Sequence, residues 1–175
     1  MATTAPSALT LGKISPIHMN HTILKFFTVC VAVALFSNTI EANNLLQPNS
    51  KYSPRQVVEI QLRALQKNDD PTPGNGIAQT WAFAHPNNRA VTGPLARFTQ
   101  MISSANYRFL LGHETHTIES VVKTTEMALY RVTIISASGK KYSLQWRVLK
   151  VQSGTLSGAW MTVAVSPPQR AGNAV

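Results

Sequence analysis

The sequence predicts an α+β fold in which three helices come first and a four-stranded antiparallel sheet follows, with the helices covering one face of the sheet. Two observations lead to this prediction. Between residues 53 and 106, apolar side chains recur every three or four positions, which is the period of a helix with one buried face. From about Thr115 onward, apolar and polar residues alternate, as they do in a strand with one buried face.

The first helix is predicted to begin at Ser53-Pro54. A serine oxygen can accept a hydrogen bond from a free N–H of the first turn, and proline at the first helical position loses no hydrogen bond. One stripe of this helix is apolar and consists of Val57, Val58, Leu62 and Leu65. A second stripe, at four-residue spacing, consists of Arg55, Glu59, Arg63 and Lys67. We expect the first stripe to be buried and the second to form a solvated ladder of ion pairs.

Two more helices are expected before the strands. The loop at 69–76 contains two prolines and two glycines and ends the first helix. The second helix covers 77–85 and ends before Pro86, because a residue that precedes proline avoids the helical region. Residues 87–89 are predicted to form a turn. Gly93-Pro94 then opens the third helix, whose apolar face carries Leu95, Phe98, Met101 and Ile102.

Four strands with turns between them are expected in the second half of the chain. They cover residues 115–123, 127–135, 142–148 and 160–165. The residues at 137–140 (ASGK) supply a hairpin turn, and Pro167-Pro168 ends the last strand. We expect Trp146 and Trp160 to be buried in the core.

The N-terminal 42 residues are predicted to be a targeting leader. No Asp or Glu occurs from Met1 to Ile40, and hydroxyl residues are frequent, which is the composition of a transit peptide. Residues 26–36 form an apolar run that is shorter than the roughly 20 residues needed to span a bilayer and is typical of a signal-like hydrophobic segment. The opening MATTAPSALT resembles plant plastid leaders, which implies a chloroplast protein associated with the thylakoid. Secretion is the alternative address.

These boundaries divide the chain into four parts: a leader (1–42), a polar linker (43–52), one α+β domain (53–166) and a disordered tail (167–175). No membrane span is expected in the mature chain. Cleavage after Ala42 would change the net charge from +9 to +8, because two lysines and one glutamate are lost. The single cysteine, Cys30, excludes an intramolecular disulfide and a multi-cysteine zinc site.

Four segments carry a resemblance to a known family: SPRQVVEIQLRALQKND, GIAQTWAFAHPNNRAVTGPLARFTQMI, YRFLLGH and AWMTV. In this order they resemble the domain-of-unknown-function 4864 family of bacteria and photosynthetic eukaryotes. The resemblance runs over residues 53–165 and implies a place in the nuclear-transport-factor-2-like superfamily, whose cone packs helices into the concave face of a curved four-stranded antiparallel sheet. The chain departs from the family at Ala159 and Val163-Ala164, where we expect Cys and an Asp-Gly pair. The family has no established reaction, so the resemblance implies a shape without a chemistry.

A pocket with a polar rim is the candidate site, because loops held by a rigid scaffold often carry binding residues. The candidate ligand-binding residues are Trp81, His85, Arg89, Tyr107 and His113. The alternative is that the histidine and asparagines at 85–88 satisfy free backbone groups at helix ends. His113 and His116 lack the spacing of a helical zinc motif, and residues three apart on a strand point to opposite faces, so no metal and no cofactor are expected.

The sequence favours a non-enzymatic domain that binds a small apolar or weakly anionic ligand or a protein segment. The first alternative is a pocket hydrolase or isomerase in which His85 or His113 acts as the base. The second is an electrostatic nucleic-acid binder, although the Lys and Arg residues are scattered and no recognition motif accompanies them. A cavity with or without an ionisable side chain inside would distinguish the first two.

Overall fold

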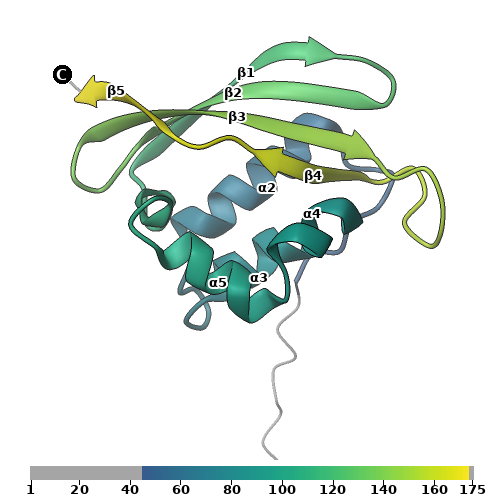
Figure 1. Cartoon of the computed structure of the whole chain (residues 1–175), viewed down its shortest axis with the longest axis horizontal. Helices are drawn as coiled ribbons and strands as arrows, with labels where there is room; N and C mark the ends of the chain where they lie inside the picture. Colours follow the sequence, from purple (N-terminus) through teal and green to yellow (C-terminus); the bar gives the residue numbers. More distant parts are fainter. Residues whose placement is uncertain (1–44, 174–175) are drawn as a thin grey trace, which may run out of the picture. The chain divides into compact units, whose positions relative to one another are not determined.

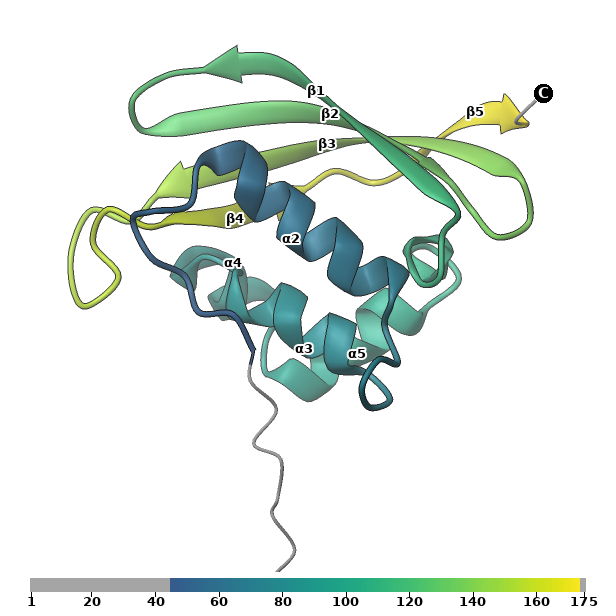
Figure 2. The same cartoon turned by 180° about the vertical axis from the view of Figure 1, so that it is seen from behind.

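The computed structural model describes residues 45–173 and confirms the α+β class. The predicted leader therefore lies outside the described residues. In chain order the elements are α2 (Pro54–Gln66), α3 (Asn75–Ala82), α4 (Pro86–Thr92), α5 (Leu95–Ser103), the 3₁₀ helix η1 (Arg108–Leu110), β1 (Thr115–Lys123), β2 (Met127–Ile135), β3 (Lys140–Lys150), β4 (Trp160–Val165) and β5 (Gln169–Asn173). The helices gather on one side of a single sheet (Figures 1 and 2). No helix within 45–173 is long and apolar enough to cross a membrane.

Helix α2 begins where the sequence predicts. Ser53 Oγ accepts from the backbone N–H of Gln56, and the Gln56 side chain accepts from the Ser53 N–H, which makes a complete capping box. Its predicted apolar stripe is buried. Its polar stripe contains one of the expected ion pairs, Arg63 with Glu59 at 2.6 Å, whereas Arg55 donates to the Ile118 carbonyl of β1 at 2.6 Å.

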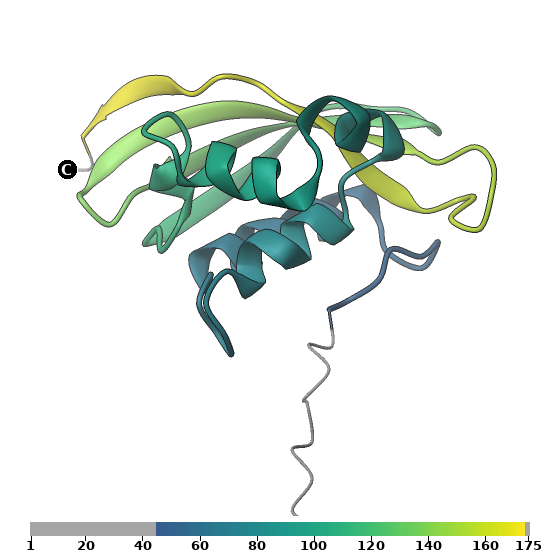
Figure 3. The same cartoon turned by 60° about the horizontal axis from the view of Figure 1, so that its bottom comes forward.

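Helices α2 and α3 lie side by side (Figure 3) and approach at backbone distance. Gly76 makes this possible, since a Cβ placed there would lie 1.9 Å from the Ala64 carbonyl oxygen. The segment predicted as a polar linker also contacts α3: the Leu46 backbone exchanges hydrogen bonds of 2.7 and 2.9 Å with the Gln79 side chain. The start of the described chain is thereby tied to the helical layer.

The described chain has four α-helices where the sequence predicts three. The predicted turn at 87–89 lies inside α4, which begins at Pro86. Proline both ends the preceding helix and suits the first position of a new one, and the His85 ring accepts from the Asn87 N–H at 3.2 Å. The turn prediction is wrong because the break between the two helices falls at residues 83–85, before Pro86.

The sheet is antiparallel in the order β1-β2-β3-β4, as the hairpins predict. The face of β2 and β3 towards the helices carries Tyr130, Val132, Ile134, Leu144, Trp146 and Val148, all buried. Trp146 and Trp160 are 2% and 8% exposed, which confirms the core positions predicted for both.

A fifth strand, β5, occupies part of the range 167–175 that the sequence predicts to be disordered. Strand β3 is longer than β4, which pairs with only Trp146 to Lys150 of it. Strand β4 does not reach the first residues of β3. Strand β5, which follows Pro167-Pro168, pairs with them on the same edge. Residues 169–173 form a strand because they satisfy backbone groups of β3 that β4 does not reach.

Candidate functional site

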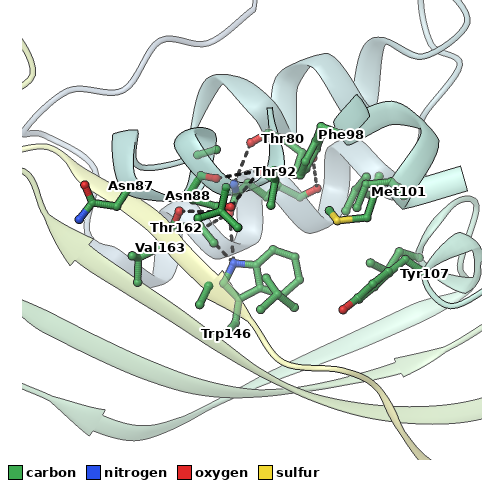
Figure 4. Close-up of a pocket in the computed structure, with 18 residues that line it drawn as sticks. Thr80, Asn87, Asn88, Thr92, Phe98, Met101, Tyr107, Trp146, Thr162 and Val163 are labelled. Carbon is green, nitrogen blue, oxygen red and sulfur yellow. Dashed lines mark hydrogen bonds between the residues drawn. The ribbon is translucent and has the colours of Figure 1, made fainter. Parts of the chain in front are cut away.

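A cavity of about 290 Å³ lies between the helices and strands β3 and β4. Eighteen residues line it, drawn from all four helices, η1 and the two strands (Figure 4). Most of the lining is apolar, and Phe98 and Met101 of α5 face Trp146 of β3 across it. The cavity is the space between the helical layer and the sheet that the side chains of these two layers do not fill.

The polar end of the cavity is a closed hydrogen-bond network centred on Trp146. The indole N–H of Trp146 donates to Thr162 Oγ1 at 2.9 Å and to Gln61 Oε1 at 3.2 Å. The Thr162 hydroxyl donates to the same Gln61 oxygen at 2.5 Å, and Gln61 Nε2 donates to the Thr80 carbonyl at 2.9 Å. Each of these buried groups therefore has a partner, so the network keeps a fixed geometry.

Strand β4 is held against the helices through Thr162. Its backbone N–H donates to the Phe83 carbonyl, and its carbonyl accepts from the His85 N–H at 2.8 Å and from Asn88 Nδ2 at 3.1 Å. The Thr92 hydroxyl in turn donates to the Asn88 side-chain oxygen at 3.0 Å. These contacts cover the free edge of β4 and fix the wall that α4 contributes to the cavity.

The opposite wall contains Tyr107, which lies between α5 and η1. In Figure 4 its hydroxyl end is directed towards Trp146. Its hydroxyl has no hydrogen-bond partner among residues 45–173, in contrast to the groups of the Trp146 network. Tyr107 is also the only titratable residue among the eighteen that line the cavity, which include no Asp, Glu, His, Lys, Arg or Cys.

The family model described as "Domain of unknown function (DUF4864)" matches residues 47–170. This range covers most of the chain and includes every residue that lines the cavity. The chain belongs to the DUF4864 family. No curated protein and no solved structure matches it.

The DUF4864 domain brings only one of the five sequence-predicted site residues, Tyr107, to the cavity wall. His85 caps α4, and Arg89 donates to the Trp81 and Ala82 carbonyls at 2.9 and 2.8 Å, where α3 ends. The Arg89 guanidinium also lies over the Trp81 ring, 5.3 Å from its centroid. Burial lowers the pKa of both His85 and Arg89. In this structure His85 and Arg89 thus both make hydrogen bonds at helix ends.

Trp81 contacts a lining residue, Phe98, from outside the cavity. Its ring contacts the Phe98 ring at a centroid distance of 5.1 Å, and Phe98 is the residue that lines the cavity. Gly93 allows this packing, because a Cβ there would lie 2.8 Å from the Trp81 ring. Trp81 thus positions a lining residue without lining the cavity.

His113 lies in a separate cluster with His116 and Glu59. Its Nδ1 is 2.7 Å from the Leu110 carbonyl, which can only accept, so Nδ1 carries a hydrogen. Its Nε2 lies 2.8 Å from His116 Nδ1, and His116 Nε2 lies 3.5 Å from a Glu59 oxygen. The two histidines meet because His113 precedes the strand, so the opposite-face argument does not apply to it. Among residues 45–173, no group of three or more potential ligands could hold a metal ion.

Burial and neighbouring positive groups shift the pKa of Glu59 in opposite directions, whereas burial dominates the pKa of His113. Burial raises the pKa of Glu59, but the hydrogen bond from Arg63 and the nearby positive charge outweigh it, so the net pKa is below the ordinary value. Burial is the main reason that the pKa of His113 is lowered.

Four polar lining residues that sequence reasoning missed are Gln61, Thr80, Thr92 and Thr162. A usable signal exists for Gln61, because it falls on the apolar stripe of α2 between Val58 and Leu65. A polar residue on a buried stripe needs a hydrogen-bond partner, and here the partners are Trp146 and Thr162. Nothing local to the sequence identifies those partners.

Proposed function

We propose that this DUF4864 protein binds a small, neutral, mainly apolar ligand in the cavity. The observation that carries the proposal is an apolar cavity of about 290 Å³ whose wall contains no charged side chain. Small-molecule sites begin at roughly 300 Å³. An engineered apolar cavity of roughly 150 Å³ takes up benzene, so by proportion this one suits a ligand of about a dozen non-hydrogen atoms.

A neutral ligand is favoured over an anionic one. An ion that enters an apolar cavity loses its hydration, and this loss is offset only by a partner of opposite charge. The lining offers no cation, and the nearby Arg89 is engaged with the end of α3. The proposed ligand is therefore neutral, whereas the sequence also allows a weakly anionic one.

The acid–base enzyme has less support than the binding domain. General acid–base catalysis needs a titratable group within hydrogen-bond reach of the substrate. Neither His85 nor His113 lines the cavity, and the hydrogen bonds of both engage other parts of the domain. The protein side chains that could take part in a reaction in this cavity are Tyr107 and neutral amides and hydroxyls.

We further propose that the domain is a nuclear-transport-factor-2-like cone and that the chain is a chloroplast protein. The cone is supported by a single antiparallel sheet with its helices on one side and a cavity between the two layers. A crystal structure tests the cone. The chloroplast address is supported by the composition of residues 1–42.

Binding can be tested by NMR with two probes of nine non-hydrogen atoms, acetophenone and benzoate, at pH 7. The chain has three tryptophans, and only Trp146 lines the cavity. We expect acetophenone to shift the indole N–H signal of Trp146 and to leave those of Trp81 and Trp160 in place. Benzoate, which is ionised at this pH, should shift none of them. No response to acetophenone, or an equal response to benzoate, would reject the proposal.

A matched pair of variants locates the entrance. Val91 lines the cavity and is 70% exposed, while Val121 is 47% exposed and lies outside it. Val91→Phe should weaken the effect of acetophenone on Trp146, because the larger ring narrows the opening. Val121→Phe adds the same side chain elsewhere and should leave the titration unchanged.

A further inference from the structure

The backbone of Tyr107 is fixed on both sides of the residue. Its N–H donates to the Ser104 carbonyl at 3.1 Å, and its own carbonyl accepts from the Leu110 N–H at 2.9 Å. These bonds tie it to the end of α5 and to η1. The ring is half-buried and forms part of the cavity wall, with its hydroxyl end directed towards Trp146 (Figure 4). The fold therefore holds the backbone of Tyr107 in place, and its ring packs against the core.

The Tyr107 hydroxyl differs from the other hydroxyls that line the cavity. Thr80 donates to the Gly76 carbonyl at 2.8 Å, Thr92 donates to Asn88, and Thr162 donates to Gln61. Each of these hydroxyl hydrogens is used within the domain. The Tyr107 hydroxyl has no such acceptor among residues 45–173, so its O–H remains available to whatever enters the cavity.

We infer that the Tyr107 hydroxyl donates a hydrogen bond to an oxygen atom of the ligand, and that the ligand is a neutral molecule with an apolar body and a carbonyl or ether acceptor. This inference rests on the proposed function. The apolar body of the ligand contacts Phe98, Met101 and Trp146. Its acceptor oxygen accepts the hydrogen bond from the Tyr107 hydroxyl. Tyr107 is thus the residue that distinguishes an oxygen-bearing ligand from a hydrocarbon of the same shape.

Two probes of identical shape isolate this hydrogen bond. Acetophenone and α-methylstyrene have the same non-hydrogen skeleton and differ only in C=O against C=CH₂. Both are titrated into the full chain with the Trp146 indole signal as the readout. The variants are Tyr107→Phe, which removes only the hydroxyl, and Tyr142→Phe as the control. Tyr142 stacks on Phe109 and does not line the cavity.

We expect Tyr107→Phe to lower the affinity for acetophenone by about 3- to 10-fold, the usual range for one neutral hydrogen bond. Its affinity for α-methylstyrene should change by less than about twofold, because the ring that forms the wall is retained. Tyr142→Phe should leave both affinities unchanged. Comparing each probe between the unaltered chain and the variant cancels the hydration of that probe in water.

Each other outcome contradicts the inference in a recognisable way. If Tyr107→Phe weakens both probes equally, the ring shapes the wall and its hydroxyl does not bind the ligand. If it changes neither, another donor such as Asn88 Nδ2 serves the acceptor. If neither probe binds the unaltered chain, the proposed function fails, and this inference fails with it. Binding of both probes without an effect of Tyr107→Phe overturns the inference and leaves the proposed function standing.

Discussion

Thr162 joins the edge of the sheet to the helical layer through both its backbone and its side chain. The backbone bonds hold residues 83–85 against β4, and the hydroxyl lies between Trp146 and Gln61. The side-chain bonds are buried, so the groups that would lose them could not turn to water instead. A residue with no charge and a small side chain therefore determines how the polar end of the cavity is arranged.

Replacing Thr162 with valine keeps the shape and removes the hydroxyl. We expect Thr162→Val to lower the free energy of unfolding by about 1–2 kcal/mol, because Trp146 Nε1 loses its nearer acceptor. Chemical denaturation followed by tryptophan fluorescence measures this change. Thr117→Val on an exposed position of β1 is the control and should stay within about 0.5 kcal/mol. Equal effects of the two variants would show that the network adds no stability.

His113 makes the stability of the domain depend on pH. Its side chain is 2% exposed, and burial lowers its pKa, so the unfolded chain binds more protons than the folded chain below about pH 6.5. The stabilisation is present above that pH and is lost as the pH falls towards the lowered pKa.

We therefore expect the free energy of unfolding to fall between pH 7 and pH 5.5. His113→Gln should make this fall shallower, because the group that titrates is gone. Part of the slope should remain, since burial lowers the pKa of His85 in the same direction. Glu59 does not contribute in this range, because its pKa lies below the ordinary carboxylate value. Denaturation curves at several pH values test this, and an unchanged slope in His113→Gln would contradict it.

At the scale of elements, the helical layer depends on two close contacts at glycines. At Gly76 the backbones of α2 and α3 meet, and at Gly93, between α4 and α5, the backbone lies against the Trp81 side chain. Glycine is needed in both because a side chain would occupy the space that the neighbour fills. Both contacts lie within the helical layer that forms one side of the cavity.

Gly76→Ala reverses the usual effect of this substitution in a helix. Alanine is ordinarily more stable than glycine within a helix by about 0.5–1 kcal/mol. Here the new Cβ would overlap the Ala64 carbonyl, and we expect a loss of about 1–3 kcal/mol or more, measured by thermal or chemical unfolding. Adding Ala64→Gly should not restore stability, because the clash is with backbone atoms. A stabilised Gly76→Ala variant would show that the helices can separate freely.

At the scale of the whole chain, the charge and the cavity are separate. The predicted mature region carries 14 Lys and Arg against 6 Asp and Glu, yet none of these residues lines the cavity. Any electrostatic interaction would therefore take place on the surface, and ligand binding would depend on shape and neutral hydrogen bonds. The two kinds of binding can be tested independently. Added salt should weaken an electrostatic interaction at the surface and leave the affinity for a neutral ligand in the cavity unchanged.

The predicted leader has a direct test. We expect the protein purified from its source organism to begin near Asn43, because residues 1–42 have the composition of a cleaved transit peptide with a signal-like segment. N-terminal sequencing together with plastid fractionation measures both the cleavage and the address. An intact Met1, or recovery of the protein only outside plastids, would reject the prediction.

The sequence by itself determined the α+β class, the start of α2, the hairpin at 137–140 and the burial of Trp146 and Trp160. These features depend on residues close together in the chain, because capping, turn formation and alternation act over a few positions. The tertiary structure decided that Pro86 starts a helix, that the tail forms β5 and that Tyr107, and not His85 or Arg89, lines the cavity. A cavity is the space left between segments that are distant in sequence, so its lining depends on how α4, α5, β3 and β4 pack together, and no local pattern encodes that packing.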